Sequence, residues 1–278
     1  MQTIEYSIKL TPSEIEQFHV HGYHIQRNVF NLDQVVTLKA YFDDLAEKGV
    51  PAPDNHWVPD LNPENFKKDP LARYPRVMMP HRFNDQSRKM MLELKIRDLL
   101  WQFFNEEPLS AQSMFYFKPP GSRGQALHQD NFYLSVKPGT CIAAWTAIDP
   151  ATPENGGLYV VPNTGDLAIT CPEKADEAES FVSHFVKPPP GKKAIPVHLQ
   201  PGDTLFFNGN VIHGSGPNRH ATQWRRAFIC HYIPRTTQFA SKYYKPFVTF
   251  EDEEVAIAES TDGGPCGTEW GAKDPYGA

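Results

Sequence analysis

The segment around residue 128 carries the side chains that most clearly suggest chemistry, because His128 and Asp130 are separated by a single residue. If this segment is an extended strand, both side chains point to one face and can bind one ion from the same side. His213 ends a short apolar stretch and supplies a second imidazole. Two imidazoles and one carboxylate on one face of a metal, with open positions opposite, form the ligand set of non-haem Fe(II) oxygenases.

A second chemical feature is Arg225, which opens a predicted β-strand. An arginine in that place is costly unless it meets a carboxylate, which its guanidinium can bind in bidentate fashion. An Fe(II) centre of this kind needs a dicarboxylate co-substrate that is held at its far end, and Arg225 fits that role. Arg226, the next residue along the strand, should face the other way.

The elements that must position these residues are predicted to be helices first and short strands later. Capping and periodicity predict helices over 12–21, 32–48 and 84–106, with a strand over 23–30 and a Pro-rich lid or surface loop over 50–80. Strands are predicted at 113–117, 141–148, 158–161, 204–207, 211–213 and 225–233. Because these strands lack helical crossovers, we expect a mainly β fold with flanking helices and a double-stranded β-helix core, a cupin-like jelly roll.

The domain organisation follows from length and composition. With 278 residues and 40% hydrophobic residues, the chain can build one large core. We expect a single oxygenase domain over 1–278. Its N-terminal helices and Pro-rich loop (1–106) would pack on the jelly-roll core (107–250), followed by an acidic and then Gly-rich tail (251–278).

Charge and cysteine content exclude several classes of protein. The net charge of −6 argues against a nucleic-acid-binding face, and no apolar run is long enough to span a membrane. The N-terminus lacks the pattern of a secretory signal, and the C-terminus is not a peroxisomal signal. The four cysteines show no C-x-x-C spacing. We therefore expect a cytoplasmic protein with reduced thiols.

The segments around the site resemble the phytanoyl-CoA dioxygenase family of Fe(II)- and 2-oxoglutarate-dependent oxygenases. The resemblance rests on Lys-Pro-Pro at 118–120, Leu-His-Gln-Asp at 127–130, Ala-Trp-Thr-Ala-Ile at 144–148, Asn-Gly-Gly-Leu at 155–158, Ile-His-Gly-Ser-Gly-Pro-Asn at 212–218 and Arg-Arg-Ala at 225–227. A bare His-x-Asp is weak evidence, but the combination in this order is specific. One departure is Pro-Asn-Thr-Gly at 162–165, where the family often has Pro-Gly-Ser-His.

The resemblance implies roles for particular residues. His128, Asp130 and His213 would be the iron ligands, and Arg225 would bind the distal carboxylate of 2-oxoglutarate. Further contacts to the co-substrate are implied for Ser215, Trp145 and Met114, with Arg76 a weaker match. Trp145 and Met114 can equally be read as ordinary core residues.

The implied reaction is hydroxylation of an unactivated C–H bond of a small-molecule metabolite, using O2 and releasing succinate and CO2. Relatives of the same fold that desaturate, epimerise or cyclise are the alternative within this enzyme class. A non-catalytic, cupin-like metal-binding protein is the rival from another class. Arg225 argues against that rival, because a structural metal does not need a group that binds dicarboxylates.

The substrate and the oligomeric state are left open by the sequence. Four aromatic residues close to the site could line an apolar pocket or belong to the core: Tyr116, Phe132, Tyr133 and Trp224. Five basic residues could meet an anionic substrate such as a carboxylate, phosphonate or acyl-CoA, or could be solvated surface: Arg73, Arg76, Arg82, Lys118 and Arg123.

Overall fold

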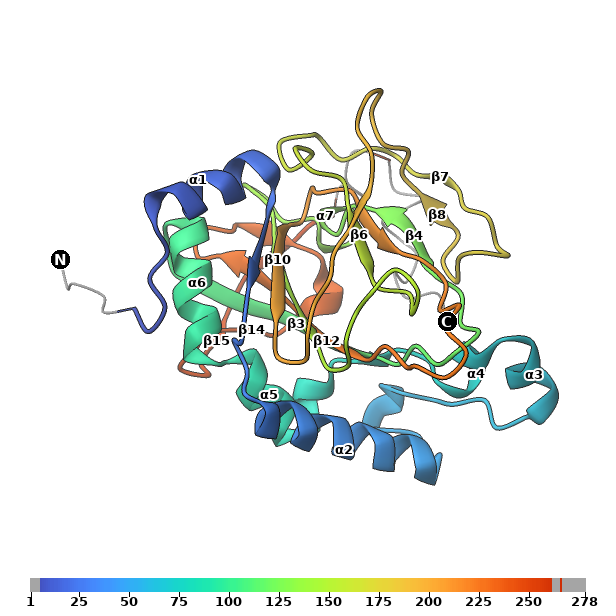
Figure 1. Cartoon of the computed structure of the whole chain (residues 1–278). Helices are drawn as coiled ribbons and strands as arrows, with labels where there is room; N and C mark the ends of the chain where they lie inside the picture. The colour runs from blue at the N-terminus through green and yellow to red at the C-terminus, as the bar shows by residue number, and fades with distance from the viewer. Residues whose placement is uncertain (1–5, 262–265, 267–278) are drawn as a thin grey trace.

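A computed structural model of the chain describes residues 6–261 and 266. Two facing β-sheets form its centre, and the long helices lie outside one of them (Figure 1). The helices are α1 (Pro12–His21), α2 (Leu32–Lys48), α3 (Pro63–Lys68), α4 (Pro70–Arg73), α5 (Asp85–Met91), α6 (Leu94–Phe104) and α7 (Asn131–Leu134), with 3-10 turns η1 (Pro53–Asn55), η2 (Pro80–Arg82) and η3 (Lys242–Tyr244). In this described part, no helix combines the length and apolar character needed to cross a membrane.

The larger sheet has eight strands, with the order β1-β10-β5-β12-β3-β14-β15 and β2 paired to β3. Its strands are β1 (Tyr23–Gln26), β2 (Val77–Met78), β3 (Pro108–Tyr116), β5 (Ile142–Ala147), β10 (Thr204–Asn208), β12 (Ala227–Pro234), β14 (Phe247–Val248) and β15 (Glu254–Val255). The smaller sheet, ordered β4-β11-β6-β9, contains β4 (Gln125–His128), β11 (His213–Ser215), β6 (Leu158–Val160) and β9 (Ile195–Pro196). Two short pairs, β7 (Glu173–Lys174) with β8 (His184–Phe185) and β13 (Phe239–Ala240) with β16 (Ala258–Glu259), complete the strands described.

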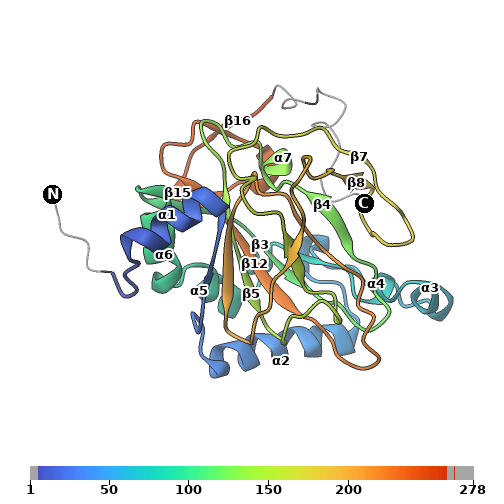
Figure 2. The ribbon, with the colours of Figure 1, turned by 45° about the horizontal axis from the view of Figure 1, so that its top comes forward.

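Side chains of the larger sheet alternate between two cores. In β5, Ile142 and Ala144 join the core beneath the helices, whereas Ala143 and Trp145 join the core between the sheets. This is the period of two that a strand buried on both faces requires. The turned view shows α2, α5 and α6 along one side of the larger sheet and β4 on the other (Figure 2). The metal-binding candidates therefore lie between the sheets, on the side away from the helices.

The first two helices form where the sequence predicts them, because their ends are fixed locally. Thr11 and Asn31 each complete a capping box, and Gly22 and Gly49 end the two helices in the left-handed region at φ 82° and 64°. The predicted helix over 84–106 is instead two helices. Glu93, in an extended conformation, separates α5 from α6 and lets both helices bury apolar faces.

Other predicted boundaries also shift. The strand expected over 23–30 ends at residue 26, and β3 begins at residue 108, before the predicted start at 113. The Pro-rich segment over 50–80 contains η1, α3, α4 and β2. In the predicted tail, β15 pairs with β14 and β16 with β13, so this part joins the sheets. Except for residue 266, the tail beyond residue 261 lies outside the described residues.

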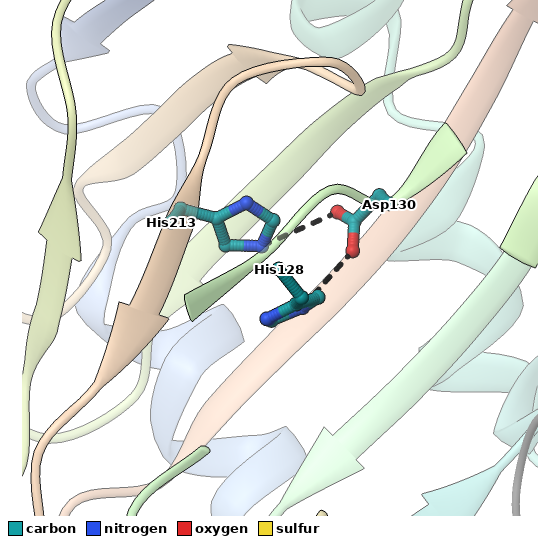
Figure 3. Close-up of side chains that lie close together, drawn as sticks. All are labelled: His128, Asp130 and His213. Carbon is teal, nitrogen blue, oxygen red and sulfur yellow. Dashed lines mark ion pairs between the residues drawn. The ribbon is translucent and has the colours of Figure 1, made fainter. Parts of the chain in front are cut away.

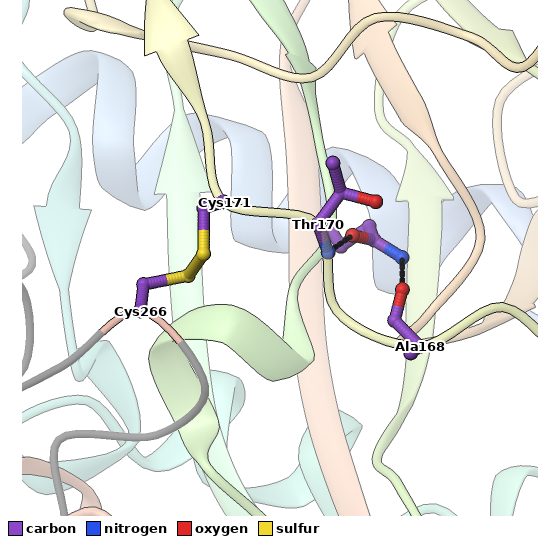
Figure 4. Close-up of a disulfide and its surroundings, with 5 residues drawn as sticks. Ala168, Thr170, Cys171 and Cys266 are labelled. Atoms are coloured by element: carbon purple, nitrogen blue, oxygen red, sulfur yellow. Dashed lines mark hydrogen bonds between the residues drawn. A yellow bond between two sulfur atoms is a disulfide. The ribbon is translucent and has the colours of Figure 1, made fainter.

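The prediction of four reduced thiols is wrong for two of the cysteines. Cys171 and Cys266 form a disulfide, with their Cα atoms 5.5 Å apart (Figure 4). Their 95-residue separation gives no local spacing signal, so the pair was missed. Cys141, just before β5, and Cys230, in β12, are free and buried, as small apolar residues often are.

Candidate functional site

The predicted metal-binding residues meet between the two sheets. His128 is the last residue of β4, and His213, the first residue of β11, is its direct cross-strand partner. Asp130 follows two residues after His128, and its carboxylate lies 3.3 Å from Nε2 of His128 and 3.5 Å from Nε2 of His213 (Figure 3). One ligand atom from each of the three buried residues lies within 4.8 Å of the others. The group can hold one metal ion.

The local reason for this convergence differs from the sequence prediction. Asp130 is not in an extended strand. It has φ −65° and ψ −34° and precedes α7, so the chain turns immediately after β4. The intervening Gln129 anchors this turn, since its amide donates to the carbonyls of Ala168 and Asn210 and its oxygen accepts from the backbone N–H of Thr170. Ala168 and Thr170 lie in the segment that leads to the disulfide (Figure 4).

Both imidazoles are held with Nε2 available as a ligand. Nδ1 of His128 donates to the carbonyl of Ala126 at 2.8 Å, and Nδ1 of His213 donates to that of Val211 at 2.9 Å. A ring that donates from Nδ1 keeps its lone pair on Nε2, and such bonds to carbonyls orient histidine ligands in metal sites. The side-chain amide of Gln125 donates to Nε2 of His128 at 3.0 Å, which fits the same tautomer.

The charge state of the group also suits a cation. Burial by itself raises the pKa of Asp130, but the neighbouring His213 and His231, which also donates a hydrogen bond, lower the pKa well below its usual value. Burial lowers the pKa of His213 to about 4. At neutral pH the site therefore presents an ionised carboxylate and a neutral His213 imidazole, the forms that bind metals.

His231 is a residue of this site that the sequence analysis missed. It lies on β12, and its Nε2 donates to Oδ2 of Asp130 at 2.9 Å. With Nε2 as the donor, Nδ1 is the bare nitrogen, and it has no hydrogen-bond partner among the described residues. One sequence signal could have indicated it. Residues two apart in a strand point to the same face, so His231 lies on the same face as Ile229, a residue of the core between the sheets.

We expect a His231→Phe variant to bind Fe(II) about 10- to 100-fold more weakly, because the carboxylate of Asp130 loses the donor that orients it. His231→Gln keeps an N–H donor and should recover part of the affinity. Anaerobic metal titration of both variants measures this effect. Unchanged metal affinity in His231→Phe would show that Asp130 is oriented without His231.

The three residues of the triad line a cavity that is partly open to solvent. All five residues for which a co-substrate contact was predicted line this cavity: Met114, Trp145, Ser215, Arg225 and Arg76. Met114 and Trp145 also belong to the core between the sheets, so they pack as core residues, and their contact with the co-substrate stays a prediction.

Arg225 is the buried cation of the cavity. The residue is 2% exposed, its Nε donates to the carbonyl of Gly156 at 3.1 Å, and its Cζ lies 5.3 Å from the centre of the Trp145 ring. Burial lowers the pKa of Arg225 to about 10, so the group remains charged at neutral pH. Its Nη1 is buried without a hydrogen-bond partner in the described part of the chain. A buried donor of this kind calls for an anionic ligand.

The aromatic candidates divide into two groups. Tyr116 and Tyr133 line the cavity. Phe132 packs edge-on against Tyr133 and is not among the lining residues. Trp224 lies beneath the guanidinium of Arg226 and joins the core under the helices. Neither Phe132 nor Trp224 is therefore placed to line this cavity.

Of the five basic candidates, only Arg76 lines the cavity, where its guanidinium lies over the rings of Tyr116 and Phe181. The others are engaged elsewhere: Arg73 with the carbonyl of Ala46, Arg82 with that of Lys245, Arg123 with Asp69, and Lys118 with backbone and hydroxyl oxygens behind the cavity wall. Most of the cations that could have met an anionic substrate are thus already paired.

The triad, the buried arginine and the double sheet can be compared with known proteins. Residues 18–227 match the profile of the phytanoyl-CoA dioxygenase family, PhyH. The chain belongs to this family. It is therefore an enzyme, a dioxygenase that uses iron as its cofactor and 2-oxoglutarate and O2 as co-substrates.

Among its relatives, phytanoyl-CoA dioxygenase 1 of Oryza sativa is 30% identical over 150 residues, which are 51% of this chain and 52% of that protein. The peroxisomal phytanoyl-CoA dioxygenase of Rattus norvegicus is 25% identical over 274 residues, covering 94% and 80% of the two chains. A methylphosphonate hydroxylase of Gimesia maris is 24% identical over 237 residues, covering 84% and 85%.

Solved structures support the fold of the family. EctD from S. alaskensis, with 2-oxoglutarate and 5-hydroxyectoine, superposes with a TM-score of 0.65 at 19% identity, over 82% of this chain and 78% of that one. The epimerase SnoN, with Fe3+, α-ketoglutarate and nogalamycin RO, gives 0.64 at 19% identity, over 81% and 84%. The carbocyclase SnoK gives 0.62 at 17% identity, over 82% and 86%. The predicted fold, a cupin-like jelly roll with flanking helices, is confirmed.

Proposed function

We propose that this dioxygenase hydroxylates an unactivated C–H bond of a small-molecule metabolite, with His128, Asp130 and His213 as the Fe(II) ligands and release of succinate and CO2. The carrying observation is that the buried triad and the buried, incompletely bonded Arg225 line one cavity. A metal site alone would not require this arginine. We further propose that the whole chain works as one oxygenase domain.

The residues fit the metal that the family uses. Two imidazole nitrogens and one carboxylate approach from one side, which is the facial ligand set of non-haem Fe(II) oxygenases, and the cavity lies on the open side. When bound, Fe(II) together with 2-oxoglutarate and O2 supplies the oxidising power that breaks the C–H bond. The chain's residues orient the reactants and keep water from the reacting atoms.

The co-substrate end of the cavity is assigned to Arg225 and Ser215. The free Nη1 of Arg225 would bind the distal carboxylate, for which a planar guanidinium has matched geometry. Trp145 and Met114 would pack against the carbon chain, and Arg76 would stand at the wall as a further cation. Tyr116 and Tyr133 would then face the substrate.

Anaerobic titration with Fe(II) and 2-oxoglutarate tests this assignment through the visible charge-transfer band of the chelate. We expect a band only when both components are present. The two compounds suggested by the relatives' names, phytanoyl-CoA and methylphosphonate, then form the first screen, read as succinate release. Folded protein that gives neither a band nor succinate would support the metal-binding, non-catalytic alternative.

The reaction outcome is tested separately, because the structural neighbours include an epimerase and a carbocyclase. A product that gains one oxygen atom supports hydroxylation. Loss of two hydrogens, ring closure or inversion without added oxygen would assign the chain to the other outcomes of the fold. An anionic substrate and a cytoplasmic location remain predictions.

A further inference from the structure

Lys118 follows β3, and none of the roles above accounts for this buried lysine. Its side chain is 1% exposed. The Nζ donates to the carbonyl of Gly216 at 2.6 Å, to Oγ of Ser215 at 2.9 Å and to the carbonyl of Gly156 at 3.2 Å. These three acceptors use all three donors of an ammonium group, so Lys118 has no donor left for a ligand in the cavity.

The contact with Ser215 determines what that hydroxyl can do. Its oxygen accepts from Lys118 and also from the backbone N–H of Gln125 at 3.3 Å. A hydroxyl has two lone pairs and one hydrogen, so two incoming donors leave the O–H as a donor. Because Ser215 lines the cavity, this O–H is available to an anionic oxygen there.

The contact with Gly156 links Lys118 to Arg225. The same carbonyl accepts from Nζ of Lys118 at 3.2 Å and from Nε of Arg225 at 3.1 Å. The backbone of Lys118 accepts in turn from the N–H of Arg225 at 3.0 Å. Fixing Nε in this way leaves Nη1 of Arg225 as the donor without a partner among the described residues.

The side chain of Lys118 passes close to the backbone of Gly156, which explains why this position is a glycine. Its φ of +79° disfavours other residues, and a Cβ at this position would lie 2.8 Å from the carbonyl oxygen of Gly216 and 2.9 Å from Cδ of Lys118. The lysine stem can pass over the backbone only because no side chain stands there. The absence of a side chain at Gly156 therefore makes room for the long, straight side chain at position 118.

We infer that Lys118 is a positioning residue that fixes the O–H of Ser215 and the guanidinium of Arg225 for the distal carboxylate of 2-oxoglutarate. Burial and the nearby charge of Arg225 lower the pKa of Lys118 well below its usual value. The role therefore rests on the hydrogen bonds of Nζ to three oxygens, which match the three donors of an ammonium group. This inference rests on the proposed function of the same cavity. It adds a residue that acts on the co-substrate through two others.

The experiment compares two 2-oxo acids on the Fe(II)-loaded protein by anaerobic charge-transfer titration. 2-Oxoglutarate carries the distal carboxylate, whereas 2-oxobutyrate lacks it and makes the same chelate. We expect Lys118→Met to weaken 2-oxoglutarate about 10- to 100-fold, the range expected when hydrogen bonds to charged groups are lost. We expect its effect on 2-oxobutyrate to stay within about twofold, because that ligand does not reach the positioned donors.

Further variants separate positioning from general stability. Ser215→Ala should show the same selectivity for 2-oxoglutarate, and combining it with Lys118→Met should cost less than the sum of the two effects. The exposed Lys193→Met is the matched control and should leave both affinities unchanged. If Lys118→Met does not fold, Lys118→Gln, which retains two N–H donors, serves for the same comparison.

The outcomes are distinct. Equal weakening of both ligands, or no weakening of 2-oxoglutarate in a folded variant, would overturn the positioning role and leave a structural one. Absence of the band in the wild-type protein with either ligand would instead overturn the proposed function, and this inference with it. Selective loss of 2-oxoglutarate affinity, with Fe(II) affinity unchanged, would support Lys118 as the positioning residue.

Discussion

A His128→Ala variant is expected to lose turnover. His128 contributes one of three candidate ligand atoms, and its ring is already oriented by the carbonyl of Ala126. Loss of a residue that only orients a ligand typically costs 10- to 100-fold in metal affinity or activity, so loss of a ligand itself should cost more than about 100-fold. Fe(II) titration and succinate release with an identified substrate measure the two effects.

The control for this variant is a histidine outside the site. His198 has an exposed side chain, so His198→Ala should retain both metal affinity and turnover. Because His128 sits at the end of β4, its truncation should leave the folded structure intact, and circular dichroism can verify this. Wild-type activity in His128→Ala would refute the assignment of the triad as the iron site.

The site was largely predictable because its members are marked by local sequence. His128 and His213 stand at the ends of short strands, and Arg225 precedes another, so each is flagged by its immediate neighbours. His231 was missed because its contact with Asp130 spans 101 residues and depends on how β12 lies against the turn after β4. Sequence spacing does not encode that register.

The same division applies to the fold. Helices α1 and α2 are capped at both ends by their own residues, and both were predicted with the observed bounds. The break at Glu93 and the disulfide between Cys171 and Cys266 are set by tertiary packing, which no local pattern shows. Asp130 depends on both local sequence and tertiary contacts. Its role as a candidate ligand is indicated by the His-x-Asp motif, whereas its helical backbone is associated with the tertiary contacts of the Gln129 side chain.

Two adjacent arginines allow a sharp test of the co-substrate end of the cavity. Arg225 lines the cavity, with Nη1 unpartnered among the described residues. Arg226 points the other way and forms ion pairs with Asp149 at 2.7 Å and with Asp43 of α2 at 2.8 Å. The two residues share charge and size and lie just before β12, but their side chains point to opposite sides of the chain. Their alanine variants should therefore fail in different assays.

For Arg225→Ala we expect the binding free energy of 2-oxoglutarate to fall by about 2–4 kcal/mol, roughly 30- to 700-fold in affinity. Its free energy of unfolding should change by less than about 1 kcal/mol, because the variant removes a buried charge whose hydrogen bonding is incomplete without a ligand. Anaerobic titration measures the first quantity and denaturant unfolding without co-substrate the second.

For Arg226→Ala we expect the opposite pattern. The ion pairs tie the segment just before β12 to α2 and to Asp149, two residues after β5, so their loss should lower the free energy of unfolding by about 1–3 kcal/mol. The affinity for 2-oxoglutarate should stay within about twofold, because Arg226 does not line the cavity. If both variants lost co-substrate affinity equally, Arg225 would not be the specific binding partner of the distal carboxylate of 2-oxoglutarate. The role given to Arg225 would then be wrong.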